Sequence, residues 1–293
     1  MINDNLRAAG VMVLAMLAFA IEDALIKVLA ASMPVGQIIG VLGLGGFIVF
    51  AGICRAQGVA LCGRAFLHPA VLLRNLAELS GAVGFVTALA LIPLSTASAI
   101  LQAAPLLVTL GAALFLAEPV GWRRWGAIIV GFGGVLMIIR PGTEGFNWLS
   151  IYAVVGVLGL AARDLATRRV PAAISSMQLS MLAFASLVPA AAILIVVSGD
   201  RVVAPSPRDW GILTICVLIG AVAYFAITFA TRIGQISYVT PFRYSRMIFA
   251  LIIALVFFGE NPDALTLTGA AIIIASGLYT LWRERVVKST ASP

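Results

Sequence analysis

Long apolar runs separated by short polar segments dominate the chain. Each run holds roughly 20 residues, which is enough for a helix to cross a hydrocarbon layer ~30 Å thick. Ten such runs cover residues 9–31, 35–54, 69–92, 95–116, 122–140, 148–168, 174–198, 209–230, 236–258 and 265–283. Because apolar and polar residues do not alternate along them, the runs predict helices rather than barrel strands. The pattern therefore predicts an all-α polytopic membrane protein with ten transmembrane helices.

Lysine and arginine are unevenly divided between the two sets of helix ends. One set carries twelve of them: Arg7, Arg55, Arg64, Arg123, Arg124, Arg163, Arg168, Arg169, Arg232, Arg283, Arg285 and Lys288. The other set carries three, Arg140, Arg201 and Arg208. Under the positive-inside rule this bias predicts that both termini lie in the cytoplasm, which agrees with an even number of crossings. The expected location is a bacterial-type inner membrane.

The two halves of the chain resemble each other at a spacing of about 140 residues. Four pairs match in the same order: AIEDALIK (20–27) with AARDLATR (161–168), GAV (81–83) with GAV (220–222), FLAE (115–118) with FFGE (257–260), and GAIIVGFGGVLMIIR (126–140) with GAAIIIASGLYTLWR (269–283). Compositional similarity between apolar helices is the alternative explanation. A duplication would give five helices in residues 1–143 and five in 144–293. Because five is odd, the second repeat would be inverted, which is a common transporter architecture.

Composition and charge agree with this picture. The chain is 62% hydrophobic and only 11% charged, and its mean hydropathy is +1.10. A soluble domain of this length needs a more charged surface. The formal net charge of +7 comes from basic residues placed between apolar runs, not from one patch. It therefore indicates membrane topology and not nucleic-acid binding.

Several kinds of chemistry have little support in the sequence. Cys54, Cys62 and Cys216 are an odd number without CxxC spacing, so free thiols are expected. His68 is the sole histidine, which disfavours a zinc site or a Ser-His-Asp hydrolase. A P-loop sequence is also absent, so we expect no ATP-driven pumping by this chain. No cofactor and no metal are predicted.

Three local features resemble a known family. Lys27 stands late in the first helix ahead of Pro34, a fourth helix of small residues ends at Glu118, and the fifth helix is rich in glycine. The last two features recur at Glu260 and at 269–278. In these features the chain resembles the drug/metabolite transporter superfamily, in its ten-helix EamA-type exporter branch.

The resemblance implies efflux of amino acids or related compounds. Aromatic amino-acid exporters fit best among its members, while carriers of riboflavin, nucleosides or S-adenosylmethionine share the same helical frame. One departure from the family concerns Gly43, because many members carry an arginine there. A role borrowed from that arginine does not transfer to this chain.

Charged residues inside the apolar runs are the main functional candidates. An arginine, lysine or aspartate at the centre of a membrane helix costs about 2.5–3.5 kcal/mol on insertion scales, so such residues pair or line a cavity. Four groups qualify: Glu22, Asp23 and Lys27; Arg74 and Glu78; Arg163 and Asp164; Arg243 and Arg246. The spacing of Asp23 and Lys27 permits an i,i+4 ion pair. Arg163 and Asp164 are expected at the membrane interface, with little functional weight.

The ninth predicted helix gathers polar side chains on about half of its circumference, among them Thr240, Arg243, Tyr244 and Arg246. Such a face is expected to avoid lipid and to line a water-accessible cavity between the repeats. The alternative is an internal salt bridge to Glu78, Glu22 or Asp23 that only holds helices together. We assign Arg243 to a substrate carboxylate, because its guanidinium is a planar fork, and Arg246 to an acidic partner.

Other predicted ligands complete an amino-acid site. Glu78 or Glu22 would bind the amine, and the aromatic rings of Phe85, Tyr224 and Tyr244 would contact the substrate ring. The neutral candidates Ser98, Gln102 and Thr240 would line the cavity, while Glu22, Asp23, Lys27, Arg74 and Arg246 are candidates for ion pairs or coupling. Coupling to protons would use Glu22, Asp23 or Glu78, and uncoupled transport is the alternative. For the neutral residues the alternative is interhelical hydrogen bonding, worth about 0.6 kcal/mol on average. Pro105, Pro189 and Pro241 are expected to kink their helices.

Taken together, these features predict a secondary transporter that exports small organic metabolites by alternating access through a central cavity. The predicted substrates are amino acids, either aromatic or otherwise bulky and apolar. A membrane-embedded enzyme or a membrane scaffold is the alternative. The expected partners are a small-molecule substrate and the lipid bilayer, without nucleic acid, and we expect a monomer to suffice.

Overall fold

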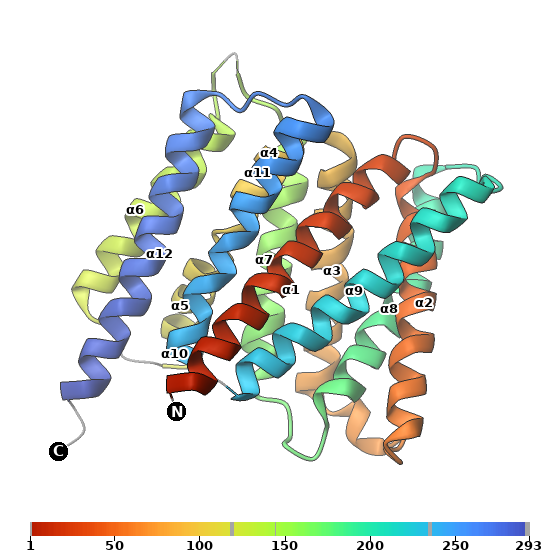
Figure 1. Cartoon of the computed structure of the whole chain (residues 1–293), viewed down its shortest axis with the longest axis horizontal. Coiled ribbons are helices and arrows are strands. Elements are labelled where there is room, and N and C mark those ends of the chain that lie inside the picture. The colour runs from red at the N-terminus through yellow and green to blue at the C-terminus, as the bar shows by residue number, and fades with distance from the viewer. Residues whose placement is uncertain (1, 118–119, 144, 234–235, 291–293) are drawn as a thin grey trace.

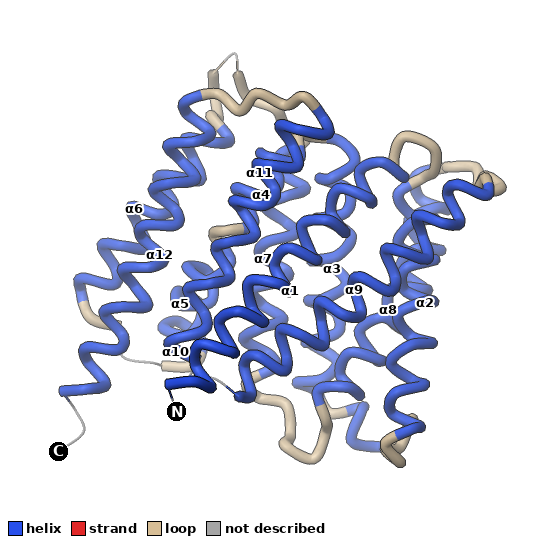
Figure 2. Tube along the Cα trace, viewed as in Figure 1, coloured by secondary structure: helices blue, strands red, loops and turns tan. Residues whose placement is uncertain are grey.

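The computed structural model describes residues 2–117, 120–143, 145–233 and 236–290. All regular structure in these ranges is helical (Figure 2). The helices are α1 (Ile2–Leu29), α2 (Val35–Ala56), η1 (Arg64–Leu67), α3 (Pro69–Leu91), α4 (Leu94–Leu101), α5 (Ala104–Phe115), α6 (Trp122–Ile139), α7 (Ser150–Thr167), α8 (Ser176–Ser198), α9 (Pro207–Ile233), α10 (Ile236–Val239), η2 (Thr240–Tyr244), α11 (Ser245–Phe258) and α12 (Ala264–Thr290).

Ten stretches of the described chain are long and apolar enough to cross a membrane, from Asp4–Leu29 to Ala264–Arg283. They coincide within a few residues with the ten predicted runs, so the prediction of an all-α polytopic fold is confirmed. The outer faces agree with lipid contact. On α3, for example, Leu72, Leu73 and Leu76 are more than half exposed, and only a hydrocarbon surrounding makes such a surface favourable.

The ten spans run up and down through the bundle, and the chain ends emerge at one end of it (Figure 1). The loop after α2 lies at the same end as the termini, whereas the loops after α6 and α8 lie at the opposite end. This is the arrangement that an even number of crossings produces. The placement of the shared end in the cytoplasm stays a prediction.

Helix packing follows a two-fold pattern. If α7 to α12 repeat α1 to α6, then α3 against α7 and α9 against α1 are equivalent contacts, and both are extensive. The contacts of α1 with α11 and of α7 with α4 and α5 are equivalent in the same way. Two further packed pairs, α2 with α8 and α6 with α12, join each helix to its own counterpart. This pattern is consistent with an inverted repeat, and the boundary between residues 143 and 144 stays a prediction.

Glycine allows the closest of these contacts. A Cβ on Gly159 of α7 would lie 2.4 Å from the backbone nitrogen of Gly81 on α3. On the other side of the bundle, a Cβ on Gly134 of α6 would lie 2.7 Å from the carbonyl oxygen of Gly269 on α12. Both distances are too short for any side chain. Small residues at such crossings let membrane helices approach backbone to backbone, where close packing holds them together.

Two of the predicted continuous helices are broken, which corrects the sequence-based expectation. The fourth span divides at Gln102 and Ala103 into α4 and α5, and the ninth divides at η2 between α10 and α11. Proline explains both positions, because Pro105 and Pro241 lack the N–H that a continuous helix needs. In contrast, α8 continues through Pro189 without interruption. The two breaks lie at equivalent places of the two halves, since Gln102 corresponds to Tyr244 at the repeat spacing.

Candidate functional site

The two halves of the chain are joined by an ion pair between Asp23 of α1 and Arg246 of α11. Nη2 of Arg246 donates to both carboxylate oxygens at 2.8 and 2.7 Å, and Nε donates to Oδ2 at 3.1 Å. Asp23 is only 3% exposed. The guanidinium also lies over the rings of Phe19 and Phe85, at 5.0 and 5.6 Å from their centroids. The Arg246 guanidinium is therefore held both by its hydrogen bonds to the Asp23 carboxylate and by its contacts with the two aromatic rings.

This arrangement corrects the expected pair of Asp23 with Lys27. Lys27 instead donates to the carbonyl oxygens of Leu89 and Ile92, at 3.2 and 2.7 Å. These carbonyls belong to the end of α3, where the last turn of a helix leaves acceptors without intrahelical partners. A cation is also favoured there by the helix dipole. Lys27 therefore caps α3.

Glu22 lies beside the Asp23–Arg246 ion pair and faces α9. A Cβ on Gly220 would meet Oε1 of Glu22 at 2.4 Å, so α9 can cover this carboxylate only because residue 220 is glycine. No hydrogen bond joins the Glu22 side chain to another part of the described chain. Glu22 is therefore a second acid at this junction, and unlike Asp23 it has no hydrogen bond to a described side chain.

A second group, which we call the charged cluster, comprises Arg74, Glu78, Arg163, Asp164 and Tyr224. Arg163 Nη1 donates to both oxygens of Glu78, at 3.1 and 3.2 Å, and its Nη2 lies 2.8 Å from Oδ1 of Asp164. Arg74 Nη2 lies 3.6 Å from Glu78 and donates to the Tyr224 hydroxyl at 3.0 Å. The cluster thus links α3, α7 and α9.

The charged cluster gives Arg163 and Asp164 partners that the sequence did not predict, while their expected place at the membrane interface stays a prediction. The Arg163 side chain is 17% exposed, because it points at α3 and reaches Glu78. Arg74 also lies near a helix end, yet it is 2% exposed and donates to the carbonyl of Leu179 at 2.9 Å. Position near a helix end was therefore a poor guide, because the face of the helix decides what the side chain meets.

Arg243 of η2 stands apart from both groups. It is half-buried, and no hydrogen bond or ion pair joins it to another residue that the structure describes. Its charge acts on Asp164 and on Tyr244 through space. Of the two arginines in the ninth span, Arg246 thus pairs with an acid within the protein, while Arg243 has no such partner among the described residues.

Three buried polar side chains mark the two helix breaks. Ser98 and Gln102 come from α4 and its end, and Tyr244 ends η2; their exposures are 0%, 5% and 4%. Ser98 Oγ, Gln102 Nε2 and the Tyr244 hydroxyl have no hydrogen-bond partner among the described residues. A buried polar atom without a partner costs about 1–3 kcal/mol. Such atoms at equivalent breaks in two helices indicate a place where a ligand or water supplies the partner.

The remaining predicted residues are divided among these groups. Phe85 contacts Arg246, whereas Tyr224 belongs to the charged cluster and packs edge-on against Phe50, with ring centroids 5.7 Å apart. Thr240 is half-buried in η2. The structure therefore brings the predicted residues together in three neighbouring groups on packed helices, not in one shell.

Glu260 is a residue whose contacts sequence reasoning missed. Its carboxylate accepts from the backbone N–H groups of Leu94 and Ser95 at 2.7 and 2.9 Å and from the Ser95 hydroxyl at 2.7 Å. Lys27 Nζ lies 4.0 Å away. The acid therefore caps the start of α4 from the other half of the chain. Its recurrence with Glu118 was the available signal, although Glu118 itself lies outside the described residues.

A cavity of about 540 Å³ opens at the end of the bundle opposite the termini. Residues of both halves line it, including Lys27 of α1, Ala90 of α3, Asp209 of α9 and Phe258 of α11. Lys27 thus borders this opening while it caps α3 and lies 4.0 Å from Glu260. The cavity therefore lies between the two halves of the chain.

Residues 6–140 and 147–282 match the EamA-like transporter family. An S-adenosylmethionine uptake transporter of Rickettsia felis is 30% identical over 226 residues, covering 77% of this chain and 75% of that protein. A pseudopaline exporter of Pseudomonas aeruginosa is 30% identical over 285 residues, covering 94% and 96%. A riboflavin transporter of Rhizobium johnstonii is 28% identical, covering 70% and 67%. One crystal structure, 17% identical, has a similar fold, with a TM-score of 0.62 over 96% of this chain and 98% of that one.

Proposed function

This chain belongs to the EamA-like transporter family of the drug/metabolite transporter superfamily, and we propose that it exports amino acids with aromatic or other bulky apolar side chains. It is a multi-pass inner-membrane transporter of small molecules, as its family and relatives are. The enzyme alternative is excluded on the same ground. The substrate class, the direction of transport and the residue roles below are our proposal.

Arg243 is the observation that carries the proposal. A guanidinium inside a membrane bundle is costly unless it pairs or faces a polar cavity. Arg243 has no hydrogen-bonded or ion-paired partner in the described chain, although Arg246, one turn away, has one. A planar fork with free donors suits a carboxylate, which it can bind with two parallel hydrogen bonds. We therefore assign the substrate carboxylate to Arg243.

The surrounding residues support the rest of an amino-acid site. Tyr244, Ser98 and Gln102 offer polar atoms that lack partners in the described chain, and they stand at the two helix breaks with Thr240. Discontinuous helices form substrate sites in many transporters with inverted repeats, because their exposed backbone ends meet the ligand. We assign these four residues to polar groups of the substrate. Phe85, Tyr224 and Tyr244 would contact its side chain.

The substrate amine needs an acid, and two are proposed. Glu22 has no hydrogen bond to another described residue, so it can accept an amine directly. Glu78 is already engaged by Arg163 and Arg74, and an amine would compete with these guanidinium groups. Glu22 is therefore the less encumbered of the two candidates, and Glu78 fits a coupling role better.

Alternating access would proceed by movement of the two repeats, residues 1–143 and 144–293, against each other. The two-fold pattern of helix contacts supports this division. The Asp23–Arg246 pair connects the repeats, and so do Glu260 with the start of α4 and Arg163 with Glu78. Breaking and remaking such inter-repeat contacts is how a carrier can open alternately to its two sides. We further propose that a monomer suffices and that the termini face the cytoplasm.

Export is the proposed direction, and among the substrates of the relatives S-adenosylmethionine fits the proposed residue roles. The pseudopaline exporter aligns over 94% of this chain, against 77% for the S-adenosylmethionine uptake transporter. S-adenosylmethionine also carries an α-carboxylate and an α-amine, so the same roles of Arg243 and Glu22 would serve it. It is therefore the second candidate.

A transport assay in proteoliposomes tests the proposal. Vesicles containing the purified protein would be loaded with labelled phenylalanine, leucine, S-adenosylmethionine or riboflavin, and efflux would be followed with and without a proton gradient. We expect saturable efflux of the amino acids above that of protein-free vesicles. Efflux of S-adenosylmethionine or riboflavin without that of the amino acids would overturn the substrate class and leave the transporter assignment standing.

A further inference from the structure

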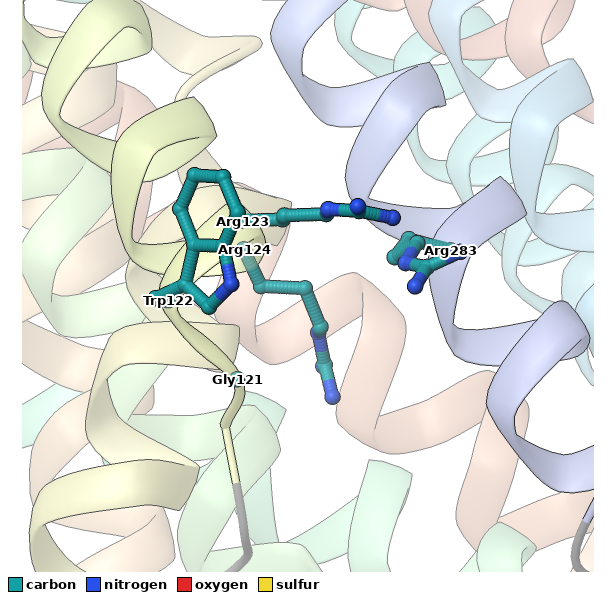
Figure 3. Close-up of a pocket in the computed structure, with 5 residues that line it drawn as sticks. All are labelled: Gly121, Trp122, Arg123, Arg124 and Arg283. Atoms are coloured by element: carbon teal, nitrogen blue, oxygen red, sulfur yellow. The ribbon is translucent and has the colours of Figure 1, made fainter.

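A basic cavity lies between α6 and α12, at the end of the bundle where the chain termini emerge (Figure 3). Its volume is about 260 Å³, and its lining comprises Gly121, Trp122, Arg123, Arg124 and Arg283. Three of these five residues are arginines, and none of the described lining residues is acidic. Like charges that share a cavity repel, and a bound anion would relieve this repulsion.

Two of the arginine side chains approach each other. Figure 3 shows the side chain of Arg123 reaching from the start of α6 toward Arg283 on α12, while the side chain of Arg124 extends in another direction, away from both. Two guanidinium groups that face each other across a cavity repel, and an anion between them turns this repulsion into two attractions. Arg123 is in addition held over the Trp122 ring, 5.3 Å from its centroid, so one face of the guanidinium is fixed and its N–H edge stays available.

The backbone at the start of α6 adds positive potential to the same cavity. Gly121 precedes the first turn of α6, and no side chain caps that end among the described residues. The first N–H groups of a helix lack intrahelical acceptors, and the helix dipole places partial positive charge there. Because the arginines and the helix start surround one cavity, both favour the same anionic ligand.

The surroundings of the cavity indicate which anion would bind. Trp122 is 78% exposed, and Trp282 and Tyr279 on α12 are 55% and 39% exposed with their rings 5.7 Å apart. Exposed tryptophan and tyrosine at the end of a membrane helix lie at the depth of the lipid headgroups. Farther along α6, Ile129 and Val130 are 67% and 58% exposed, and they offer an apolar surface to acyl chains.

We propose that this cavity binds the phosphate headgroup of an anionic phospholipid in the leaflet at the terminal end of the bundle. The phosphate would lie between Arg123 and Arg283, with the N–H groups of the first turn of α6 as further donors. The acyl chains would follow the exposed apolar face of α6. Basic pockets between membrane helices at the cytoplasmic side recognise anionic headgroups in this way, and a lipid there would link α6 to α12, the last helices of the two repeats.

The experiment compares lipid binding by the intact protein and two matched variants. Wild type, Arg123→Gln/Arg283→Gln and the control Arg55→Gln/Arg64→Gln would be delipidated in detergent and supplied with phosphatidylglycerol or phosphatidylcholine. The control removes two exposed arginines predicted at the same end of the bundle but outside the cavity. Bound lipid would be counted by native mass spectrometry, and thermal unfolding would be measured in parallel. Glycerol phosphate, added to wild type in a separate sample, provides the headgroup without acyl chains.

We expect wild type and control to retain phosphatidylglycerol and to gain about 3 °C in unfolding midpoint, since a ligand that binds only the folded state stabilises it. The cavity variant should lose most of the adduct and of this gain, and phosphatidylcholine should give neither. Equal retention by the cavity variant, or equal loss by the control, would overturn the proposal. A gain with glycerol phosphate as large as with the lipid would show a site for soluble phosphates instead.

Should the double variant fail to fold, Arg283→Gln alone is measured by the same native mass spectrometry. The single change leaves Arg123 stacked on Trp122 and removes one side of the phosphate site. At least a fivefold loss of bound phosphatidylglycerol is expected. Retention equal to that of wild type would again overturn the proposal.

Discussion

Arg246 donates hydrogen bonds to the Asp23 carboxylate from two nitrogens, Nε and Nη2, although 223 positions separate the two residues in the chain. The contact joins α11 to α1, and so connects the second half of the protein to the first. Because Asp23 is almost fully buried, its charge depends on this one guanidinium. The pair therefore contributes to holding the bundle together, and it does so at a junction where the halves would have to move.

Replacement of Arg246 by alanine is expected to destabilise the protein by about 3–5 kcal/mol, because it leaves a buried carboxylate without its partner. The double variant Asp23→Asn/Arg246→Gln should be destabilised by less than the sum of its single changes, since neither charge is then stranded. Thermal unfolding in detergent measures both. Arg201→Ala, an exposed arginine on a loop, is the control and should have little effect. An unfolding midpoint for Arg246→Ala within error of the control would show that the pair contributes no stability.

The sequence predicted the positions of the helices better than the partners of the charges. Apolar runs set the length of each span, and the structure agrees with all ten. The breaks were harder to place, because a proline predicts a weakened helix but not whether it bends or divides: Pro105 and Pro241 stand at breaks, whereas Pro189 lies within an unbroken α8. Packing against neighbouring helices decides that outcome.

Partners across the bundle could not be read from spacing. Arg246 was predicted to pair with an acid, but the sequence did not distinguish among Glu78, Glu22 and Asp23. Only the fold, which brings α11 beside α1, selects Asp23. The spacing of Asp23 and Lys27 allowed an ion pair that the structure does not contain. An i,i+4 pair on a helix is worth only about 0.2–0.5 kcal/mol, and the carbonyl groups at the end of α3 offer Lys27 stronger ligands. The roles of these residues in transport stay predictions.

Cysteine labelling tests the orientation of the bundle. Cys62 is exposed in the loop after α2, and this loop lies at the end where the termini emerge (Figure 1), whereas Cys54 and Cys216 are fully buried. A membrane-impermeant maleimide added from the periplasm should therefore leave the native protein unlabelled. In a Cys62→Ser background, Gly142→Cys and Ser206→Cys place thiols at the opposite end and should label. Labelling of Cys62 but of neither introduced cysteine would reverse the orientation and remove the positive-inside argument.

Asp263, in the loop before α12, predicts a small dependence of stability on acid. The hydrogen bond from Arg140, with further ones from Thr266, lowers the pKa of Asp263 from 3.8 to about 2. A carboxyl whose pKa is lower in the folded state stabilises the fold above its ordinary pKa. This contribution should be lost as the pH falls from about 4 to about 2.

The Asp263 side chain is half exposed, so we expect the contribution to be below about 1 kcal/mol and to shrink in high salt. Asp263→Asn should lower stability slightly at pH 7 and flatten the pH dependence between about 4 and 2. Unfolding curves measured across this range at two salt concentrations would check it. A variant that follows the wild-type curve throughout would contradict the assignment.

Glu78 is the residue through which a proton would act if transport is coupled to a gradient. Protonation of its carboxylate would weaken its bonds to Arg163 and its ion pair with Arg74, and so loosen α3 from α7. Glu78→Gln mimics the protonated form, so we expect it to lose gradient-driven transport while exchange of substrate across the membrane continues. Asp164→Asn, which leaves Glu78 intact, is the control. An unchanged pH dependence of transport in Glu78→Gln would remove Glu78 as a coupling residue.

Arg243 provides the sharpest test of the proposed substrate site, because its loss strands no described partner. Arg243→Lys keeps the positive charge and removes the planar fork, so a substrate carboxylate loses its paired hydrogen bonds. Hydrogen bonds to charged groups contribute about 1.5–3 kcal/mol, which corresponds to a loss of roughly 10- to 100-fold in apparent affinity. The thermal unfolding midpoint should stay close to that of wild type, in contrast to Arg246→Ala. Normal efflux by Arg243→Ala would show that the substrate role is wrong, and misfolding of both arginine variants would show that the two residues are structural.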